Sequence, residues 1–134
     1  MQVTGTWSGT AHYDPAVSTL RVGVPLDRAV GLTMTEDAAG NLLGTFTLET
    51  YTPWIGMPPV TQVVSVVGKA SASSMSVNVP VSFYGGKEAY KMSDDVSTVC
   101  ADGSVGRVLS GTFNSKDING SGSGPVTLNN CPVI

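Results

Sequence analysis

Residues 3–13 read Val-Thr-Gly-Thr-Trp-Ser-Gly-Thr-Ala-His-Tyr, and two kinds of residue alternate along them. Apolar residues and glycine, among them Trp7 and Tyr13, take the odd positions, whereas Thr, Ser and His12 take the even positions. Successive side chains of a β-strand point to opposite faces, so a period of two indicates a strand. This stretch therefore predicts a strand with one apolar face and one hydroxyl face.

The same period recurs along the chain, with turn residues between the segments. The sequence Asp37-Ala-Ala-Gly-Asn41, for example, separates two alternating segments and suits a short hairpin loop. We expect strands over residues 3–13, 26–36, 42–48, 60–67, 74–83, 107–113 and 126–133. A pattern of about eight such strands predicts one all-β domain over residues 1–134, an antiparallel up-and-down β-barrel. A two-sheet β-sandwich is the alternative.

The apolar faces of these strands would point into the barrel. Their side chains are bulky enough to fill a small barrel, leaving at most a modest pocket at one mouth. Pro80 cannot donate a backbone hydrogen bond, so its strand is expected to be bent, bulged or at an edge there. Loops are expected at residues 14–25, 51–59, 85–95 and 119–125, with a short helix considered only at Lys87–Ser93. The expected inward residues are Trp7, Leu32, Met34, Phe46, Leu48, Val77, Val79, Leu109 and Phe113.

Composition limits the partners of the chain. A net charge of −3 with only 7 Lys and Arg in 134 residues is too little positive charge for nucleic-acid binding. No run approaches the roughly 18 apolar residues of a membrane helix, so membrane insertion is not expected. Charged residues make up only 13% of the chain, and Ser and Thr must supply most of its polar surface.

Two cysteines indicate the compartment. An even number of cysteines in a small, hydroxyl-rich chain predicts one disulfide, Cys100–Cys131, and an extracellular, periplasmic or cell-envelope location. The chain opens directly into the strand pattern at Val3 with no signal peptide before it, so export is inferred rather than read. Two cysteines and the single His12 fall short of a tetrahedral metal site, and no metal or cofactor is predicted.

Gly5-Thr6-Trp7 in the first strand, followed by similar Gly-Thr-Phe steps ending at Phe46 and Phe113, resembles the calycin-like barrels, the lipocalin and avidin type of closed sheet. The resemblance implies that Trp7 packs the closed end of the barrel. It does not extend to biotin binding, because no polar residue comparable to the biotin-binding Asn follows Trp7, and Trp54 lies in a loop-like segment.

One loop stands out as a candidate binding element. Tyr51, Trp54 and Met57 lie in a segment that runs into Pro58-Pro59, and such side chains are costly to leave exposed. They either fold over the core or form a contact patch. The candidate ligand-binding residues are Tyr51, Trp54, Met57, Tyr84 and Tyr90.

Two constellations resemble catalytic sites. His12 and Asp14 lie two residues apart, as a carboxylate that orients an imidazole would, but a solvated surface histidine is the simpler interpretation. Asp94-Asp95 with Glu88 could pair for acid–base chemistry, whereas a charged turn capped by a serine is the plainer reading. We predict no catalytic residues.

These features favour a secreted or cell-envelope binding module for a small apolar ligand or a protein partner. A structural subunit of an extracellular or shell-like assembly is an alternative, because a surface with few charges packs readily against copies of itself. A small barrel enzyme of the cyclase or isomerase type is a second alternative. An interior that holds Tyr, His and a carboxylate together would favour the enzyme.

Overall fold

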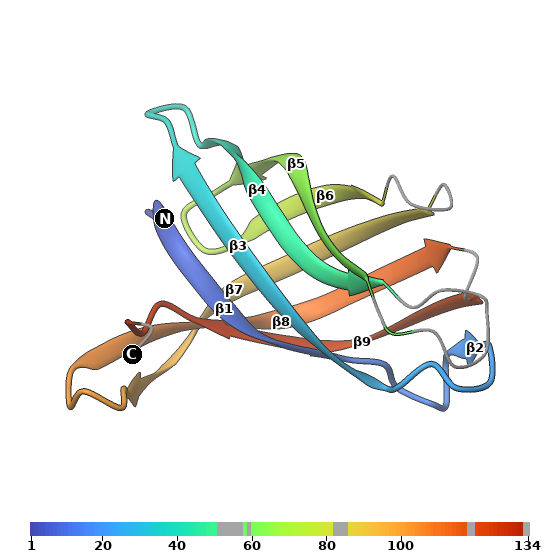
Figure 1. Cartoon of the computed structure of the whole chain (residues 1–134). Coiled ribbons are helices and arrows are strands. Elements are labelled where there is room, and N and C mark those ends of the chain that lie inside the picture. The colour runs from blue at the N-terminus through green and yellow to red at the C-terminus, as the bar shows by residue number, and fades with distance from the viewer. Residues whose placement is uncertain (51–57, 59, 82–85, 118–119, 133–134) are drawn as a thin grey trace.

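The computed structural model describes residues 1–50, 58, 60–81, 86–117 and 120–132 (Figure 1). Within these ranges every regular element is a β-strand. The strands are β1 (Gly5–His12), β2 (Thr19–Leu20), β3 (Asp27–Glu36), β4 (Asn41–Thr50), β5 (Val60–Ala70), β6 (Met75–Val81), β7 (Gly86–Val99), β8 (Val105–Asp117) and β9 (Gly120–Asn129).

Eight of these strands form a closed antiparallel barrel. The order around it is β1-β3-β4-β5-β6-β7-β8-β9, and β9 pairs back with β1 to complete the ring. The two-residue β2 lies outside this ring order and pairs only with the start of β9 (Figure 1). The predicted up-and-down β-barrel is thus confirmed, and the sandwich alternative is not adopted.

The register places apolar residues of neighbouring strands side by side inside the barrel. Trp7 pairs with Leu32, which in turn pairs with Phe46. All nine side chains that the alternation assigned to the interior are buried, which confirms that part of the prediction.

One end of the barrel is closed around Trp7. Its indole Nε1 donates a hydrogen bond to the carbonyl oxygen of Val3 (2.9 Å), and Val3 is itself fully buried. The Val3 N–H donates to the Glu36 carboxylate at the end of β3. Arg107, at the start of β8, lies 5.4 Å over the indole ring and donates to the carbonyl oxygen of Gln2. The N-terminal segment therefore lies across this end and holds Trp7 in place.

The predicted disulfide joins Cys100, just after β7, to Cys131, just after β9, with 5.5 Å between their Cα atoms. The bond passes over the first residues of β8, the strand that lies between β7 and β9. A Cβ at Gly106 would lie 2.6 Å and 2.7 Å from the two sulfur atoms, so glycine leaves the space in which the bond fits.

Two expected loops are strands instead. Residues 86–99 form β7, and the expected loop at 85–95 with its helical option at Lys87–Ser93 is wrong because Glu88, Tyr90 and Met92 alternate into the interior. Residues 120–129 form β9 despite their glycines. A Cβ at Gly124 would lie only 1.8 Å from the backbone oxygen of His12, so the glycine-rich sequence permits a close approach of strands.

Two ladders of the ring are shorter than the others. Within the described residues β5 and β6 pair from Val67↔Asn78 to Ala70↔Met75, four pairs, and β1 and β9 also form four pairs. Each of the other ring ladders has at least seven pairs. Pro80 still pairs with β7, so the expected interruption appears on its β5 side.

Candidate functional site

The end of the barrel opposite Trp7 carries an unexpected group of polar side chains in its interior. Arg28 is the second residue of β3, and Glu88 is the third residue of β7. Ser115 lies two residues before the end of β8. These three are 5%, 3% and 6% exposed, and they are the buried polar or charged residues of the described chain. In Figure 1 this end lies on the side of the view where β2 is drawn.

An ion pair forms the centre of the group. Nη1 and Nη2 of Arg28 donate to the two carboxylate oxygens of Glu88 at 2.6 and 2.9 Å, a bidentate arrangement. Nη2 also donates to the hydroxyl oxygen of Tyr90 (3.1 Å), and that hydroxyl donates to Oε1 of Glu88 (2.5 Å). The carboxylate therefore accepts three hydrogen bonds from two strands.

Aromatic rings surround the guanidinium. Its central carbon lies 5.5 Å from the ring centroid of Tyr13 and 5.6 Å from that of Phe113, within cation–π range. The Phe113 ring also contacts the rings of Tyr13 and Tyr90, with centroids 5.1 and 5.6 Å away. The Tyr13 hydroxyl shares a 2.5 Å hydrogen bond with Oγ of Ser115. We call Tyr13, Arg28, Glu88, Tyr90 and Ser115 the interior polar cluster.

One nitrogen atom of the cluster makes no hydrogen bond at all. Among the described side-chain nitrogen and oxygen atoms that are fully buried, Nε of Arg28 makes no hydrogen bond. Buried polar groups are nearly always paired, and an unpaired one lowers stability, more so when it is charged. This N–H is therefore a buried donor for which no described group of the protein acts as acceptor.

The environment fixes the protonation states of the cluster. Burial raises the pKa of Tyr90 well above its usual value, and the charge of Glu88 raises it further. Burial likewise raises the pKa of Tyr13. Burial alone would lower the pKa of the Arg28 guanidinium, but the Tyr90 oxygen and the Glu88 carboxylate outweigh it and the pKa is raised. At neutral pH the cluster thus presents an Arg28–Glu88 ion pair and two protonated phenols.

The sequence contains a signal for this cluster that the alternation of apolar residues alone does not reveal. Arg28 lies two residues before Val30, on the same face of β3 as the buried Leu32 and Met34. Glu88 precedes Tyr90 by two residues in the same way on β7. A charged residue that continues the apolar face of a strand by a step of two is the pattern that would have found both.

Of the five residues expected to bind ligand, the structure places one. Tyr90 is 1% exposed and belongs to the interior polar cluster. The other four, Tyr51, Trp54, Met57 and Tyr84, lie outside the described residues.

Neither of the constellations that resembled catalytic sites is assembled. Nδ1 of His12 lies 2.5 Å from a carboxylate oxygen of Asp27, not Asp14, and both partners are well exposed. The expectation of a solvated histidine is therefore confirmed.

The carboxylates of β7 are separated as well. Asp94 pairs with Arg107 and Asp95 accepts a hydrogen bond from Ser110 on the exposed side, whereas Glu88 points inward. The charged turn expected here is wrong, because Asp94 and Asp95 lie within β7.

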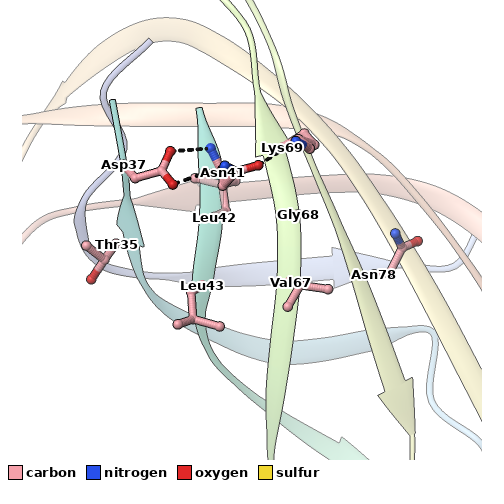
Figure 2. A pocket seen from close by; sticks show the side chains of 9 residues that line it. All are labelled: Thr35, Asp37, Asn41, Leu42, Leu43, Val67, Gly68, Lys69 and Asn78. Carbon is pink, nitrogen blue, oxygen red and sulfur yellow. Dashed lines mark hydrogen bonds between the residues drawn. The ribbon is translucent and has the colours of Figure 1, made fainter. Parts of the chain in front are cut away.

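The outer wall carries two neighbouring hollows over β4, β5 and β6. One, of about 630 Å³, is drawn in Figure 2; the second, of about 610 Å³, runs on past Pro80 to β7, and both include Leu43, Val67 and Asn78. Leu43 and Val67 are cross-strand partners and are 66% and 60% exposed. At the rim the backbone and side-chain amides of Asn41 donate hydrogen bonds to the Asp37 carboxylate, and the side-chain oxygen of Asn41 accepts one from Lys69 (Figure 2). The outer wall thus offers an apolar floor with a polar edge.

Comparison of the chain with models of protein families, with curated protein sequences and with solved structures gives no match. In the described ranges no three His, Cys, Asp or Glu residues come together as a metal site would need. No helix among those residues has the length and hydropathy needed to cross a membrane.

Proposed function

We propose that the chain is a binding module that takes a small, mainly apolar ligand into the barrel at the end that holds the interior polar cluster. The observation that carries this proposal is the buried Arg28–Glu88 ion pair. Such pairs are weak contributors to stability, because desolvation of two charges offsets their attraction, and apolar residues of similar volume stabilise a core as well or better. An ion pair at one end of an otherwise apolar interior is therefore better explained by recognition than by folding.

The surroundings of the pair suit a ligand with an apolar body. Phe113 and the ring of Tyr13 offer aromatic surface next to the guanidinium, and the rest of the interior is aliphatic or aromatic. A few convergent polar groups in an apolar setting are typical of small-molecule sites. The opposite end is filled by Trp7 and the N-terminal segment, so the ligand would approach from the Arg28 side.

The proposal can be tested by mapping where a neutral apolar probe binds. N-phenyl-1-naphthylamine is titrated into ¹⁵N-labelled protein, and saturable shifts are expected for the backbone amides of Tyr90 and Ser115. Ser115→Leu, which fills that end, should weaken binding, whereas Leu43→Ser on the outer wall should leave it unchanged. Shifts confined to Val67 and its neighbours, or sensitivity to Leu43→Ser alone, would place the probe in the outer hollows and refute the proposal.

The family and the compartment are part of the same proposal. A calycin-like barrel is supported by the position of Trp7, which packs the closed end as the resemblance through Gly5-Thr6-Trp7 implies. An extracellular or cell-envelope location is supported by the Cys100–Cys131 disulfide, since such bonds persist in oxidising compartments. Two freely alkylated thiols in protein taken from its native compartment would contradict that location.

The outer wall favours a second candidate, association with a protein partner or with other copies of the chain. Leu43, Val63 and Val67 are each at least 60% exposed, and they lie on adjacent strands of one face. Sedimentation velocity at micromolar concentration tests self-association. A monomer at all concentrations would exclude a structural subunit. An oligomer that dissociates in the Val67→Ser variant would support self-association through this face.

The enzyme alternative gains no support from the interior. The cluster contains two tyrosines and a carboxylate, but the single histidine of the chain, His12, lies outside and pairs with Asp27. The combination of Tyr, His and carboxylate that would favour catalysis is not brought together.

A further inference from the structure

We propose, on the basis of the function above, that the group recognised on the ligand is a neutral carbonyl oxygen and that it accepts a hydrogen bond from Nε of Arg28. The site would thus select apolar ketones, aldehydes, esters or amides over hydrocarbons and over carboxylic acids.

The terminal nitrogens of Arg28 are both engaged in hydrogen bonds within the cluster. Its Nη1 and Nη2 donate to the carboxylate of Glu88, and Nη2 also donates to Tyr90. The Tyr90 hydroxyl is committed to Glu88, and the Tyr13 hydroxyl to Ser115. Nε is the Arg28 nitrogen that makes no hydrogen bond. The Arg28 side chain is only 5% exposed, so this N–H is withdrawn from bulk water without a partner.

An acceptor brought by a ligand would restore the missing hydrogen bond. A ligand that cannot accept a hydrogen bond binds more weakly next to such a donor, because it excludes water from the donor without replacing the lost hydrogen bond. A hydrocarbon therefore binds at a disadvantage, and a ligand whose oxygen reaches Nε does not. Hydrogen bonds to charged donors are the stronger class, which raises the expected preference.

The charge of the cluster decides which acceptor fits. Glu88 already neutralises Arg28 through two hydrogen bonds, and the pKa values of Tyr13 and Tyr90 are raised, so both stay uncharged at neutral pH. Asp117 also faces this end closely enough to raise the pKa of Tyr13. A carboxylate ligand would add a further negative charge near Glu88 and Asp117, whereas the cation of the cluster, Arg28, is already paired with Glu88. A carbonyl oxygen accepts the hydrogen bond and adds no charge.

The aromatic rings place the apolar body of the ligand. Tyr13 and Phe113 lie against the guanidinium, so a carbonyl at Nε would have ring surface next to its substituents. A compact ligand with a carbonyl next to an aromatic or aliphatic group matches these neighbours better than one with polar groups along its whole length.

Three probes of similar shape test the selection: acetophenone, ethylbenzene and benzoate. Their dissociation constants are measured at neutral pH, and the ¹⁵Nε–¹Hε signal of Arg28 is followed in the same titrations. We expect acetophenone to bind at least about tenfold more tightly than ethylbenzene, and benzoate to bind most weakly. The Arg28 Nε signal should shift markedly with acetophenone.

Arg28→Lys removes Nε–H while keeping a cation for Glu88, so it should abolish the preference for acetophenone and leave the ethylbenzene constant nearly unchanged. Arg107→Lys, the same change at the opposite end, is the control and should preserve the preference. If Arg28→Lys does not fold, the three wild-type constants and the Nε signal still decide. Equal constants for acetophenone and ethylbenzene, or tightest binding of benzoate, would overturn this inference. Failure of all three probes to bind would instead reject the proposed function.

Discussion

Replacing Glu88 by leucine should destabilise the protein far more than replacing both members of the ion pair. Glu88→Leu leaves the Arg28 guanidinium buried, 5% exposed, without its counter-ion and without two of its hydrogen bonds. Removal of one partner of a buried pair typically lowers the free energy of unfolding by about 3–5 kcal/mol. We expect a loss in that range.

The double variant Arg28→Met/Glu88→Leu should recover most of that loss. Both charges and the unpaired Nε are then gone, and side chains of similar volume fill the same space. Apolar replacement of a whole buried pair is often neutral or stabilising by about 1–4 kcal/mol. The double variant also leaves the buried Tyr90 hydroxyl without its two partners, which costs about 1–3 kcal/mol. We therefore expect its free energy of unfolding to lie within about 2 kcal/mol of the wild type and above that of Glu88→Leu.

Urea unfolding followed by circular dichroism measures all four proteins of this cycle: the wild type, Arg28→Met, Glu88→Leu and the double variant. Equal m-values would show that the same surface is exposed in each case, so that midpoints report stability. A double variant as unstable as Glu88→Leu would mean that the pair is a requirement of the fold. The step from ion pair to ligand recognition would then fail.

Three further outcomes are expected. Trp7→Ala should lower the free energy of unfolding by about 3–5 kcal/mol, because the indole is 1% exposed and anchors the N-terminal segment. A loss below about 1 kcal/mol in chemical unfolding would contradict that role. Cys100→Ser/Cys131→Ser should lower the free energy of unfolding by about 3–4 kcal/mol, because the unfolded chain is no longer held in a closed loop. The urea midpoint should therefore fall, and an unchanged midpoint would contradict this prediction. The folded chain holds the Tyr90 proton to higher pH than the unfolded chain, so stability present below pH 10 should fall above about pH 10 by up to about 1.4 kcal/mol per unit for this group. Tyr90→Phe should flatten the fall between pH 10 and 11, and an identical slope in that variant would assign the fall to other groups.

The alternation of side chains was enough to predict the barrel. Trp7, Leu32 and Phe46 each occupy an inward position that a period of two assigns, and the observed register places Trp7 beside Leu32 and Leu32 beside Phe46. Where composition was weighed above the period, the prediction failed. The glycines of 120–124 and the charges of 86–95 suggested loops, although both segments alternate and both are strands.

The interior polar cluster was not predicted because its members are recognisable only in three dimensions. Arg28 and Glu88 are 60 residues apart, and the barrel brings β3 and β7 to face each other across the interior. Tyr90 was selected as an aromatic residue in an expected loop, whereas its role depends on a strand that points it inward. The alternation along one strand predicts which face of the sheet a residue occupies. Which residue it contacts across the interior depends on how all the strands close into the barrel.

The two four-pair ladders divide the ring into halves of equal strand number. β1, β3, β4 and β5 form one well-paired sheet and β6 to β9 form the other, and each holds together through longer ladders than those that join it to its neighbour. Local opening follows the weakest contacts, so amide exchange should proceed in two cooperative units with the earliest exchange along both junctions. The disulfide lies entirely within the second half and protects only that unit. The Arg28–Glu88 pair connects one half to the other, and a ligand bound to it would slow the separation of the two halves.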